Sequence, residues 1–200
     1  MIYQKPESLT VQKVETEAIR VPLDQVYCGS KYKMSNRCTI ITRIYTHQGV
    51  IGEVYTGDTD EEQGVIRKII HDELAPAIEG MDVFDIEGCW EKMKPATYDI
   101  LRDRNMVMQA ISAVDAALWD TVGKALEMPL YRLWGGAKKH LPIIAIGGYY
   151  GQTDAELAKE IESYRDYQVI GMKFKIGGVT PEEDLHRLQI AVQAAGEGFR

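Results

Sequence analysis

The sequence predicts an α+β domain over residues 1–138, followed by the first βαβα units of a parallel sheet or (β/α) barrel over residues 139–200. Three observations support this fold class. Three β-rich segments lie close together between residues 11 and 55, which is typical of an antiparallel meander. A long segment after residue 105 repeats its apolar residues with the helical period of 3.6. After residue 139, short apolar segments alternate with helical segments that begin at capping residues.

The expected meander has three strands. The first covers Val11–Val21 and leads into a polar loop at Pro22–Asn36. The second covers Arg37–Tyr45, and a turn at His47–Gly49 connects it to the third, Val50–Tyr55. Because these connections are short, consecutive strands are expected to pair antiparallel.

Helices are expected to complete the first domain. Thr59–Glu62 has the pattern of a capping box and predicts a helix that ends near Ile78. A shorter helical segment covers Val83–Lys94, and the longest helix runs from Asn105 to about Leu126. Pro129 then prevents that helix from continuing.

The second part alternates strands and helices. Leu141–Ile146 and Val169–Ile176 are the expected strands. Thr153 begins a helix that reaches about Tyr167, and Thr180, followed by proline, begins the next. A complete (β/α)8 barrel takes roughly 250 residues, so a barrel that begins near residue 139 is incomplete in this chain.

Composition narrows the class of protein. The chain has 200 residues, of which 45% are hydrophobic and 26% charged, and its net charge is −7. Such an acidic chain argues against binding to nucleic-acid phosphates. There is no apolar run of the ~20 residues needed to span a membrane, and the start has no signal-peptide core. Cys28, Cys38 and Cys89 form no CxxC pair, so we expect free thiols in the cytoplasm, with a Cys28–Cys38 bridge as the less favoured alternative.

The triplet Lys173-Phe174-Lys175 is the most informative local feature. On a strand, residues two apart face the same way, so both ammonium groups project from one face. In an enclosed site, burial and mutual repulsion each lower the pKa of a lysine, which lets one act as a base while the other stays charged. Exposed lysines on a strand edge are the alternative.

A longer pattern surrounds this triplet. Its parts are the segment Ala110–Asp120, the pair Gly123-Lys124, the segment Pro129–Gly136, and the lysine triplet followed by Ile176-Gly177, in this order behind the meander. With these motifs, the chain resembles the N-terminal half of a mandelate racemase/muconate-lactonizing enzyme of the enolase superfamily. Trp134 departs mildly from the aliphatic residue that is usual before the double glycine.

The resemblance implies a fold and a chemistry. The first part corresponds to a capping domain, and the second to the start of the barrel. In this family, Mg2+ binds the substrate carboxylate and a base removes the proton α to it, giving an enediolate. Lys175 matches the base, and Lys173 matches the neighbouring cation that favours its neutral form and helps to hold the carboxylate. The three metal-binding acids of the family lie on later strands, beyond Arg200, so no metal ligand is expected in this chain.

The same resemblance makes the loops of the cap candidates for substrate binding. The loop at Pro22–Asn36 carries polar and aromatic side chains, and a second loop follows the third strand at Tyr55–Asp58. Two tyrosines at the end of the first barrel strand are further candidates. A plain solvated hairpin connection is the alternative for the first loop. The residues expected to contact substrate are Tyr27, Lys31, Tyr32, Tyr55 and Tyr150.

Other polar groups are expected to be structural. Asp115 lies on the apolar stripe of the long helix, so a buried hydrogen-bonding role is favoured over a catalytic one. The four histidines have no metal-ligand spacing and are expected at the surface. Gly177-Gly178 could cradle a phosphate, but acidic residues crowd the following helix, which favours a plain turn.

Two function classes follow. The first is an enolase-superfamily lyase or isomerase, either an acid-sugar dehydratase or a racemase/epimerase, with a small-molecule carboxylate substrate and a homo-oligomeric state. The polar side chains of the cap loop lean toward an acid sugar. The alternative is a non-catalytic fragment, or a half-protein that needs another chain to complete the barrel, because two barrel strands leave an open sheet edge.

Overall fold

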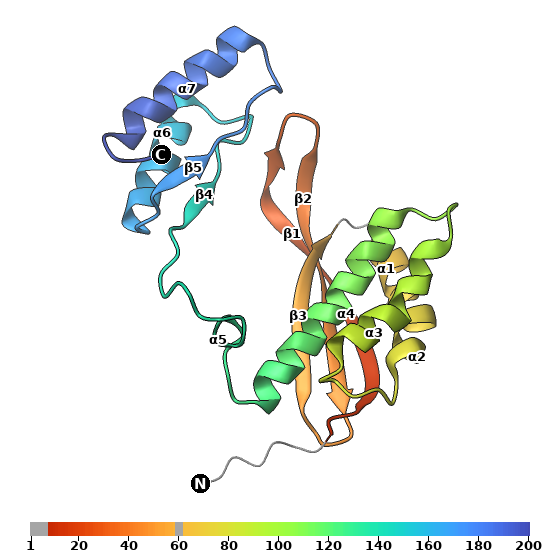
Figure 1. The fold of residues 1–200 in the computed structure, drawn as a ribbon. Helices are drawn as coiled ribbons and strands as arrows, with labels where there is room; N and C mark the ends of the chain where they lie inside the picture. Colours follow the sequence, from red (N-terminus) through yellow and green to blue (C-terminus); the bar gives the residue numbers. More distant parts are fainter. Residues whose placement is uncertain (1–7, 59–61) are drawn as a thin grey trace. The chain divides into compact units, whose positions relative to one another are not determined.

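The computed structural model describes residues 8–58 and 62–200, and the chain divides into two compact units (Figure 1). The first unit lies within residues 1–21 and 36–137, and the second within residues 22–35 and 138–200. Residues 22–35 therefore belong with the barrel-like part of the chain. The capping box predicted at Thr59–Glu62 falls largely on residues outside the described ranges.

A three-stranded antiparallel sheet confirms the predicted meander. Its strands are β1 (Val11–Cys28), β2 (Lys33–Thr46) and β3 (Ile51–Asp58), in the order β1-β2-β3. In the β2–β3 register, Ile41 lies opposite Tyr55. The turn between these strands forms at residues 47–49, as predicted.

The polar loop predicted at Pro22–Asn36 is wrong, because both flanking strands continue through most of it. Only residues 29–32 lie between β1 and β2. β1 is an edge strand, where proline is tolerated because its missing N–H need not pair. The side chains of residues 21–26 are largely exposed, so this part of the strand lacks the alternation of apolar residues that sequence reading relies on.

Three consecutive helical pieces of two kinds form the segment between residues 63 and 78. It consists of α1 (Gln63–Ile69), the π-helical turn η1 (Ile70–Leu74) and α2 (Ala75–Ile78), so the predicted end at Ile78 is confirmed. Pro76 occupies the first turn of α2. Because proline has no N–H to donate, the regular i→i−4 pattern is interrupted there, and the wider turn of η1 directly precedes it.

The remaining helices of the first unit follow the prediction with shifted ends. They are α3 (Ile86–Met93), the 3₁₀ helix η2 (Lys94–Tyr98), α4 (Arg104–Ala125) and the short α5 (Leu130–Leu133). α3 begins later than expected because Asp85 caps it, accepting a hydrogen bond of 3.0 Å from the backbone N–H of Gly88.

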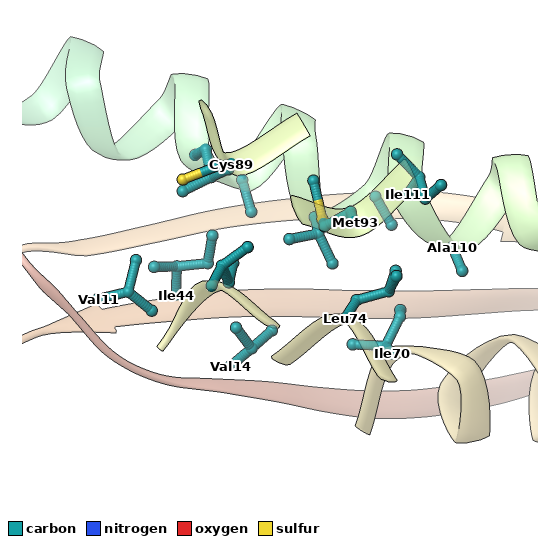
Figure 2. Packing of buried hydrophobic residues seen from close by; sticks show 14 of the residues in the cluster. Val11, Val14, Ile44, Ile70, Leu74, Cys89, Met93, Ala110 and Ile111 are labelled. Carbon is teal, nitrogen blue, oxygen red and sulfur yellow. The ribbon is translucent and has the colours of Figure 1, made fainter. Parts of the chain in front are cut away.

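The core of the first unit lies between the sheet and the helices (Figure 2). Val11, Val14 and Ile44 contribute from the strands, and α4 contributes Ala110 and Ile111. Burial raises the pKa of Cys89, another core residue, to about 11, so its thiol stays protonated. These side chains and the other labelled residues of the helices form one hydrophobic core that packs the helices against the sheet. The other labelled residues are Ile70, Leu74 and Met93.

The long helix α4 is also tied to β3 by polar contacts. Asp120 accepts a 2.7 Å hydrogen bond from the backbone N–H of Glu53, and Lys124 donates a 3.0 Å bond to the carbonyl of Ile51. A side chain at Gly52 would overlap Thr121 and the carbonyl of Ala117, so the β3 backbone lies directly against the helix. These contacts give the Asp120 and Lys124 positions of the helical motif a structural role.

The second unit contains a parallel pair of strands and two helices. Its elements are β4 (Ile144–Ile146), α6 (Asp154–Asp166), β5 (Gly171–Lys173) and α7 (Pro181–Ala195). The capping boxes predicted at Thr153 and Thr180 are both confirmed. Both strands are shorter than predicted. Arg200, at the end of the chain, forms backbone hydrogen bonds with residues in and beside β5. The backbone N–H of Met172 donates to the Arg200 carbonyl over 2.7 Å, and the Arg200 N–H donates to the Ile170 carbonyl over 2.9 Å.

None of the helices in the described ranges is long and apolar enough to span a membrane. The three cysteines are unbridged.

Candidate active site

The two lysines of the triplet lie at and just beyond the end of β5. Lys173 is the last residue of the strand and pairs in register with Ile146. Lys175 lies two residues further on, in the connection to α7, so the prediction that both lysines lie on a strand extending to Ile176 is wrong. Lys173 is exposed and Lys175 is half-buried.

Phe174 lies on the helix side of this unit, as predicted. It packs with Met172 against the apolar cluster that α6 and α7 form around Leu157 and Ile161. Because side chains alternate along a strand, Lys173 projects from the face opposite to Met172 and Phe174. In a closed barrel, that face is the interior.

Aromatic rings surround the amine of Lys175. Its Nζ atom lies 5.3 Å from the ring centroid of Tyr149 and 5.8 Å from that of Tyr32. Tyr27 contacts Tyr149 edge to face, with 5.0 Å between their centroids. Cation–π attraction to two rings holds the amine in place when it is charged. The structure therefore brings Tyr27, Tyr32 and Lys175 together with Tyr149, one of the two tyrosines suggested at the end of the first barrel strand.

A backbone bridge explains why residues so distant in sequence meet. The N–H of Tyr150 donates a 2.9 Å hydrogen bond to the carbonyl of Cys28, and the two residues form an isolated antiparallel bridge. The hairpin turn itself is closed by a 3.0 Å bond from the Gly29 N–H to the Tyr32 carbonyl. The tip of the β1–β2 hairpin is thereby fixed beside the end of β4.

The phenol of Tyr149 stays neutral near neutral pH. Burial raises the pKa of Tyr149 and the neighbouring Tyr32 adds to the effect, while the positive charge of Lys175 acts in the opposite direction. A neutral phenol both donates and accepts hydrogen bonds. Beside the amine of Lys175, it could contact either a hydroxyl or a carboxylate of a bound ligand.

Tyr150 is engaged within the protein. Its hydroxyl accepts a 2.8 Å hydrogen bond from the Gly178 N–H and donates one of 3.2 Å to Asp184. Its role in substrate binding stays a prediction. Asp184 also accepts a 2.6 Å bond from the Gly177 N–H, so a carboxylate of the protein uses the donor that a phosphate would need. The plain-turn interpretation of Gly177-Gly178 is thus supported.

Two other expected substrate contacts are solvent-exposed. Lys31 lies in the hairpin turn between β1 and β2. Tyr55 is 77% exposed. It lies on β3 of the first unit, which continues to Asp58, so the loop predicted at Tyr55–Asp58 is wrong. For both residues, substrate binding stays a prediction.

Asp184 and Arg187 are the residues that sequence reasoning missed. Their side chains are only 13% and 14% exposed and form an ion pair of 2.9 Å. The signal that could have found them is their i, i+3 spacing in the first turns of the helix that follows the lysine triplet.

Asp115 lies outside this group, in the first unit. It is half-buried and lines an open cleft of about 650 Å³ together with Trp90 and Trp119. Burial raises the pKa of Asp115. No hydrogen bond to its carboxylate occurs within residues 8–58 and 62–200, so the expected hydrogen-bonding role stays a prediction.

No metal site forms in the part of the chain that the structure describes. Within it, no three histidine, cysteine, aspartate or glutamate side chains come together as a metal would require. All four histidines are exposed, as predicted: His47, His71, His140 and His186.

Comparison with known proteins identifies the family. The family model described as mandelate racemase/muconate lactonizing enzyme, N-terminal domain, matches residues 10–135. Arabinonate dehydratase of Saccharolobus solfataricus is 35% identical over 171 residues, which cover 80% of this chain and 43% of that protein. The 3,6-anhydro-alpha-L-galactonate cycloisomerase of Streptomyces coelicolor is 28% identical over 195 residues, covering 94% of this chain and 52% of that protein.

Solved structures share the fold. A crystal structure of a mandelate racemase/muconate lactonizing enzyme has a TM-score of 0.90 and 47% identity, covering 96% of this chain and 52% of that one. A second, from a marine actinobacterium and in complex with magnesium, has a TM-score of 0.84 and 45% identity, covering 96% and 50%. This chain spans about half the length of these relatives. It belongs to the mandelate racemase/muconate lactonizing enzyme family of the enolase superfamily and carries that family's N-terminal domain.

Proposed function

We propose that the complete protein removes the proton α to the carboxylate of an acid sugar, with Lys175 as the base. The observation that carries this proposal is the position of half-buried Lys175, which follows the parallel strand β5 and has its amine beside the rings of Tyr32 and Tyr149. Barrel enzymes carry their chemistry at the C-terminal ends of strands, which is where this amine lies.

In the proposed step, the neutral amine of Lys175 takes the proton and becomes an ammonium group. The electron pair of the broken C–H bond moves into the carboxylate and gives an enediolate. The cationic amine of Lys173 lies at the end of β5 and would attract the substrate carboxylate and its growing negative charge. Proton transfer to a positioned base of this kind accelerates a reaction roughly 10²–10⁴-fold.

Two outcomes of the enediolate divide the candidate activities. In a dehydratase, the hydroxyl at the β carbon leaves with a proton as water, and the resulting enol becomes a 2-keto-3-deoxy acid. In a racemase or epimerase, a proton returns to the opposite face of the α carbon. Relatives named as an arabinonate dehydratase, a D-mannonate dehydratase and a D-galactonate dehydratase family member favour the first outcome.

The substrate class rests on the side chains around Lys175. The phenols of Tyr27, Tyr32 and Tyr149 could donate to or accept from several hydroxyls, which suits a polyhydroxy acid. Lys31 and Tyr55 would add further polar contacts where the cap meets the substrate.

We expect Mg2+ to be required, as in a related structure solved with magnesium. The family resemblance assigns its ligands to acids on later barrel strands, and the described residues bring no three candidate side chains together as a metal site. When bound, the ion would supply positive charge next to the substrate carboxylate.

Incubation with a panel of sugar acids in D2O tests the proposal. Arabinonate, mannonate, galactonate and galactarate cover five- and six-carbon acids with one or two carboxylates. The complete protein with magnesium is expected to exchange the α proton of at least one acid, detected by NMR, and to release a 2-keto-3-deoxy acid. Absence of both α-proton exchange and keto-acid release with all aldonates and aldarates would refute an acid-sugar substrate.

A further inference from the structure

The guanidinium group of Arg187 contacts the backbone at the ends of both parallel strands. It donates a 3.0 Å hydrogen bond to the carbonyl of Lys175, which follows β5. It also donates a 2.7 Å bond to the carbonyl of Gly148, after β4, and lies 3.5 Å from the carbonyl of Tyr149. One side chain on α7 therefore holds the backbone of the proposed base and that of its aromatic neighbour together.

The position of Arg187 is itself strongly determined. Its side chain is only 14% exposed and pairs with Asp184 over 2.9 Å. Its guanidinium carbon lies 4.2 Å from the ring centroid of Tyr150 and 4.8 Å from that of Phe174. A planar guanidinium can stack on rings and donate several hydrogen bonds at fixed angles, which a lysine ammonium cannot do.

Asp184 and Tyr150 fix the chain on the other side of Lys175. Asp184 accepts the Gly177 N–H over 2.6 Å, and the Tyr150 hydroxyl accepts the Gly178 N–H over 2.8 Å. Since Tyr150 also donates to Asp184, these groups form one connected network with Arg187. Side chains of the network therefore hold the backbone at the carbonyl of Lys175 and at the N–H groups of Gly177 and Gly178.

We propose that Arg187, held by Asp184 and Tyr150, is a positioning residue that keeps the amine of Lys175 between Tyr32 and Tyr149. This inference rests on the proposed function for its effect on catalysis, but not for its effect on the position of the amine. Lys175 lies beyond the last residue of β5, so strand pairing does not fix its backbone. The network supplies that constraint through the side chains of α7 and the end of β4.

A purely structural role would have a different signature. The network could stabilise the unit as a buried ion pair does, in which case its loss would lower the melting temperature and leave the folded protein fully active. The contacts instead converge on Lys175 and on the backbone before Tyr149. Loss of positioning would lower kcat in protein that is still folded, because misplacement of a catalytic group by about 1 Å can cost roughly 100-fold.

The catalytic test compares Arg187→Met with His186→Gln in the complete protein. His186 is the matched control because it directly precedes Arg187 in α7 and pairs with Asp154 over 2.8 Å, without contacting the strand-end carbonyls. With the sugar acid on which the wild type is active, Arg187→Met is expected to lower kcat for α-proton exchange about 10- to 100-fold with KM within about threefold. Arg187→Lys should recover only part of this loss, and His186→Gln should leave both constants unchanged.

A spectroscopic test does not require activity. Reductive methylation with 13C-formaldehyde labels the lysine amines, and the Lys175 signal is assigned as the one missing from Lys175→Arg. Rings at 5.3 and 5.8 Å should shift this signal by their ring currents. Arg187→Met should abolish most of that shift, and Asp184→Asn should reduce it if Arg187→Met does not fold. His186→Gln should preserve it.

The outcomes separate the two proposals. A wild type that neither exchanges an α proton nor releases a keto acid, with a Lys175 signal that depends on Arg187, would refute the proposed function and support the positioning role. A folded Arg187→Met variant with an unchanged Lys175 signal and unchanged kcat would overturn the positioning role. An unchanged signal with a lowered kcat would also overturn it, since the loss would then arise elsewhere.

Discussion

The Nζ atom of Lys175 lies 5.3 Å from the ring centroid of Tyr149. Tyr149 follows the strand β4 and Lys175 follows its parallel partner β5. The turn of the β1–β2 hairpin contributes Tyr32, whose ring centroid lies 5.8 Å from the same amine. The turn of the β1–β2 hairpin and the segments that follow β4 and β5, all within the second unit, thus share one small site. We expect the rate of proton transfer to Lys175 to depend on the contacts between its amine and these rings.

Removal of the Tyr149 ring should weaken that hold. Tyr149→Ala is expected to lower the rate of α-proton exchange about two- to fivefold, equivalent to the roughly 0.5–1 kcal/mol of a partly exposed cation–π contact. Tyr149→Phe keeps the ring and should stay within about twofold in kcat, with any loss in KM from the missing hydroxyl. Tyr167→Ala, at a tyrosine that is 77% exposed, is the control and should have no effect. Equal kcat values for Tyr149→Ala and Tyr149→Phe would contradict a role for the ring.

The network around Asp184 should make the second unit sensitive to acid. Hydrogen bonds from the Gly177 N–H, Tyr150 and Arg187, together with the charge of Arg187, lower the pKa of Asp184. A lowered pKa means that the carboxylate stabilises the fold above its ordinary pKa of about 4, and that this stability disappears as pH falls through the lowered value. Asp184→Asn should therefore unfold at a lower temperature at pH 7, and its melting temperature should fall less steeply below about pH 4.

Differential scanning calorimetry of the wild type and Asp184→Asn between pH 2 and pH 7 measures this. Glu162→Gln, an exposed carboxylate on α6, is the control. Parallel curves for wild type and Asp184→Asn over the whole range would show that Asp184 is not the group responsible.

The effect of pH on the stability contributed by Asp115 should be opposite to that for Asp184. Burial raises its pKa, so the folded state favours the protonated carboxyl, and the contribution to stability is lost as pH rises through the raised value. Asp115→Asn removes the charge and keeps the shape. We expect it to stabilise the chain by about 0.5 kcal/mol at pH 7, a small gain because water still screens a half-buried group, and to have no effect near pH 3.

Urea denaturation of the 200-residue chain at the two pH values checks this. Glu162→Gln, at an exposed carboxylate on α6, should change stability at neither pH. Destabilisation by Asp115→Asn at pH 7 would indicate that the carboxylate has a charged partner.

Much of this fold could be predicted because its signals are local. The period of α4 and the capping boxes of Thr153 and Thr180 depend on neighbours within a few residues, and each produced the expected helix. Strand ends depend on pairing partners instead. β1 continues to Cys28 because β2 pairs with it, and β5 ends at Lys173, short of the apolar Ile176.

The site was predictable only in part for the same reason. The lysine triplet and the tyrosines of the hairpin were visible as motifs, but their meeting depends on the bridge between Cys28 and Tyr150. That bridge joins residues more than 100 positions apart and has no sequence signal of its own. Arg187 was missed because a charged residue in a helix usually lies in water, whereas here it is stacked between two rings.

The 200-residue chain should bind magnesium weakly. Mg2+ needs several oxygen ligands in near-octahedral geometry, and the described ranges 8–58 and 62–200 bring no three suitable side chains together. Calorimetric titration with magnesium chloride is expected to give no micromolar site. Micromolar binding that is lost in Glu182→Gln or Asp184→Asn would contradict the assignment of the ligands to residues beyond Arg200.

The role of Lys175 as the base is tested most directly by α-proton exchange in the complete protein with magnesium and an active sugar acid in D2O. Lys175→Ala is expected to lower exchange on at least one face of the α carbon by about 10²–10⁴-fold, because a general base contributes roughly that factor. Lys159→Ala, at an exposed lysine on α6, should exchange at the wild-type rate. Exchange by folded Lys175→Ala at the wild-type rate would contradict the account, since the proton would then be taken by another group.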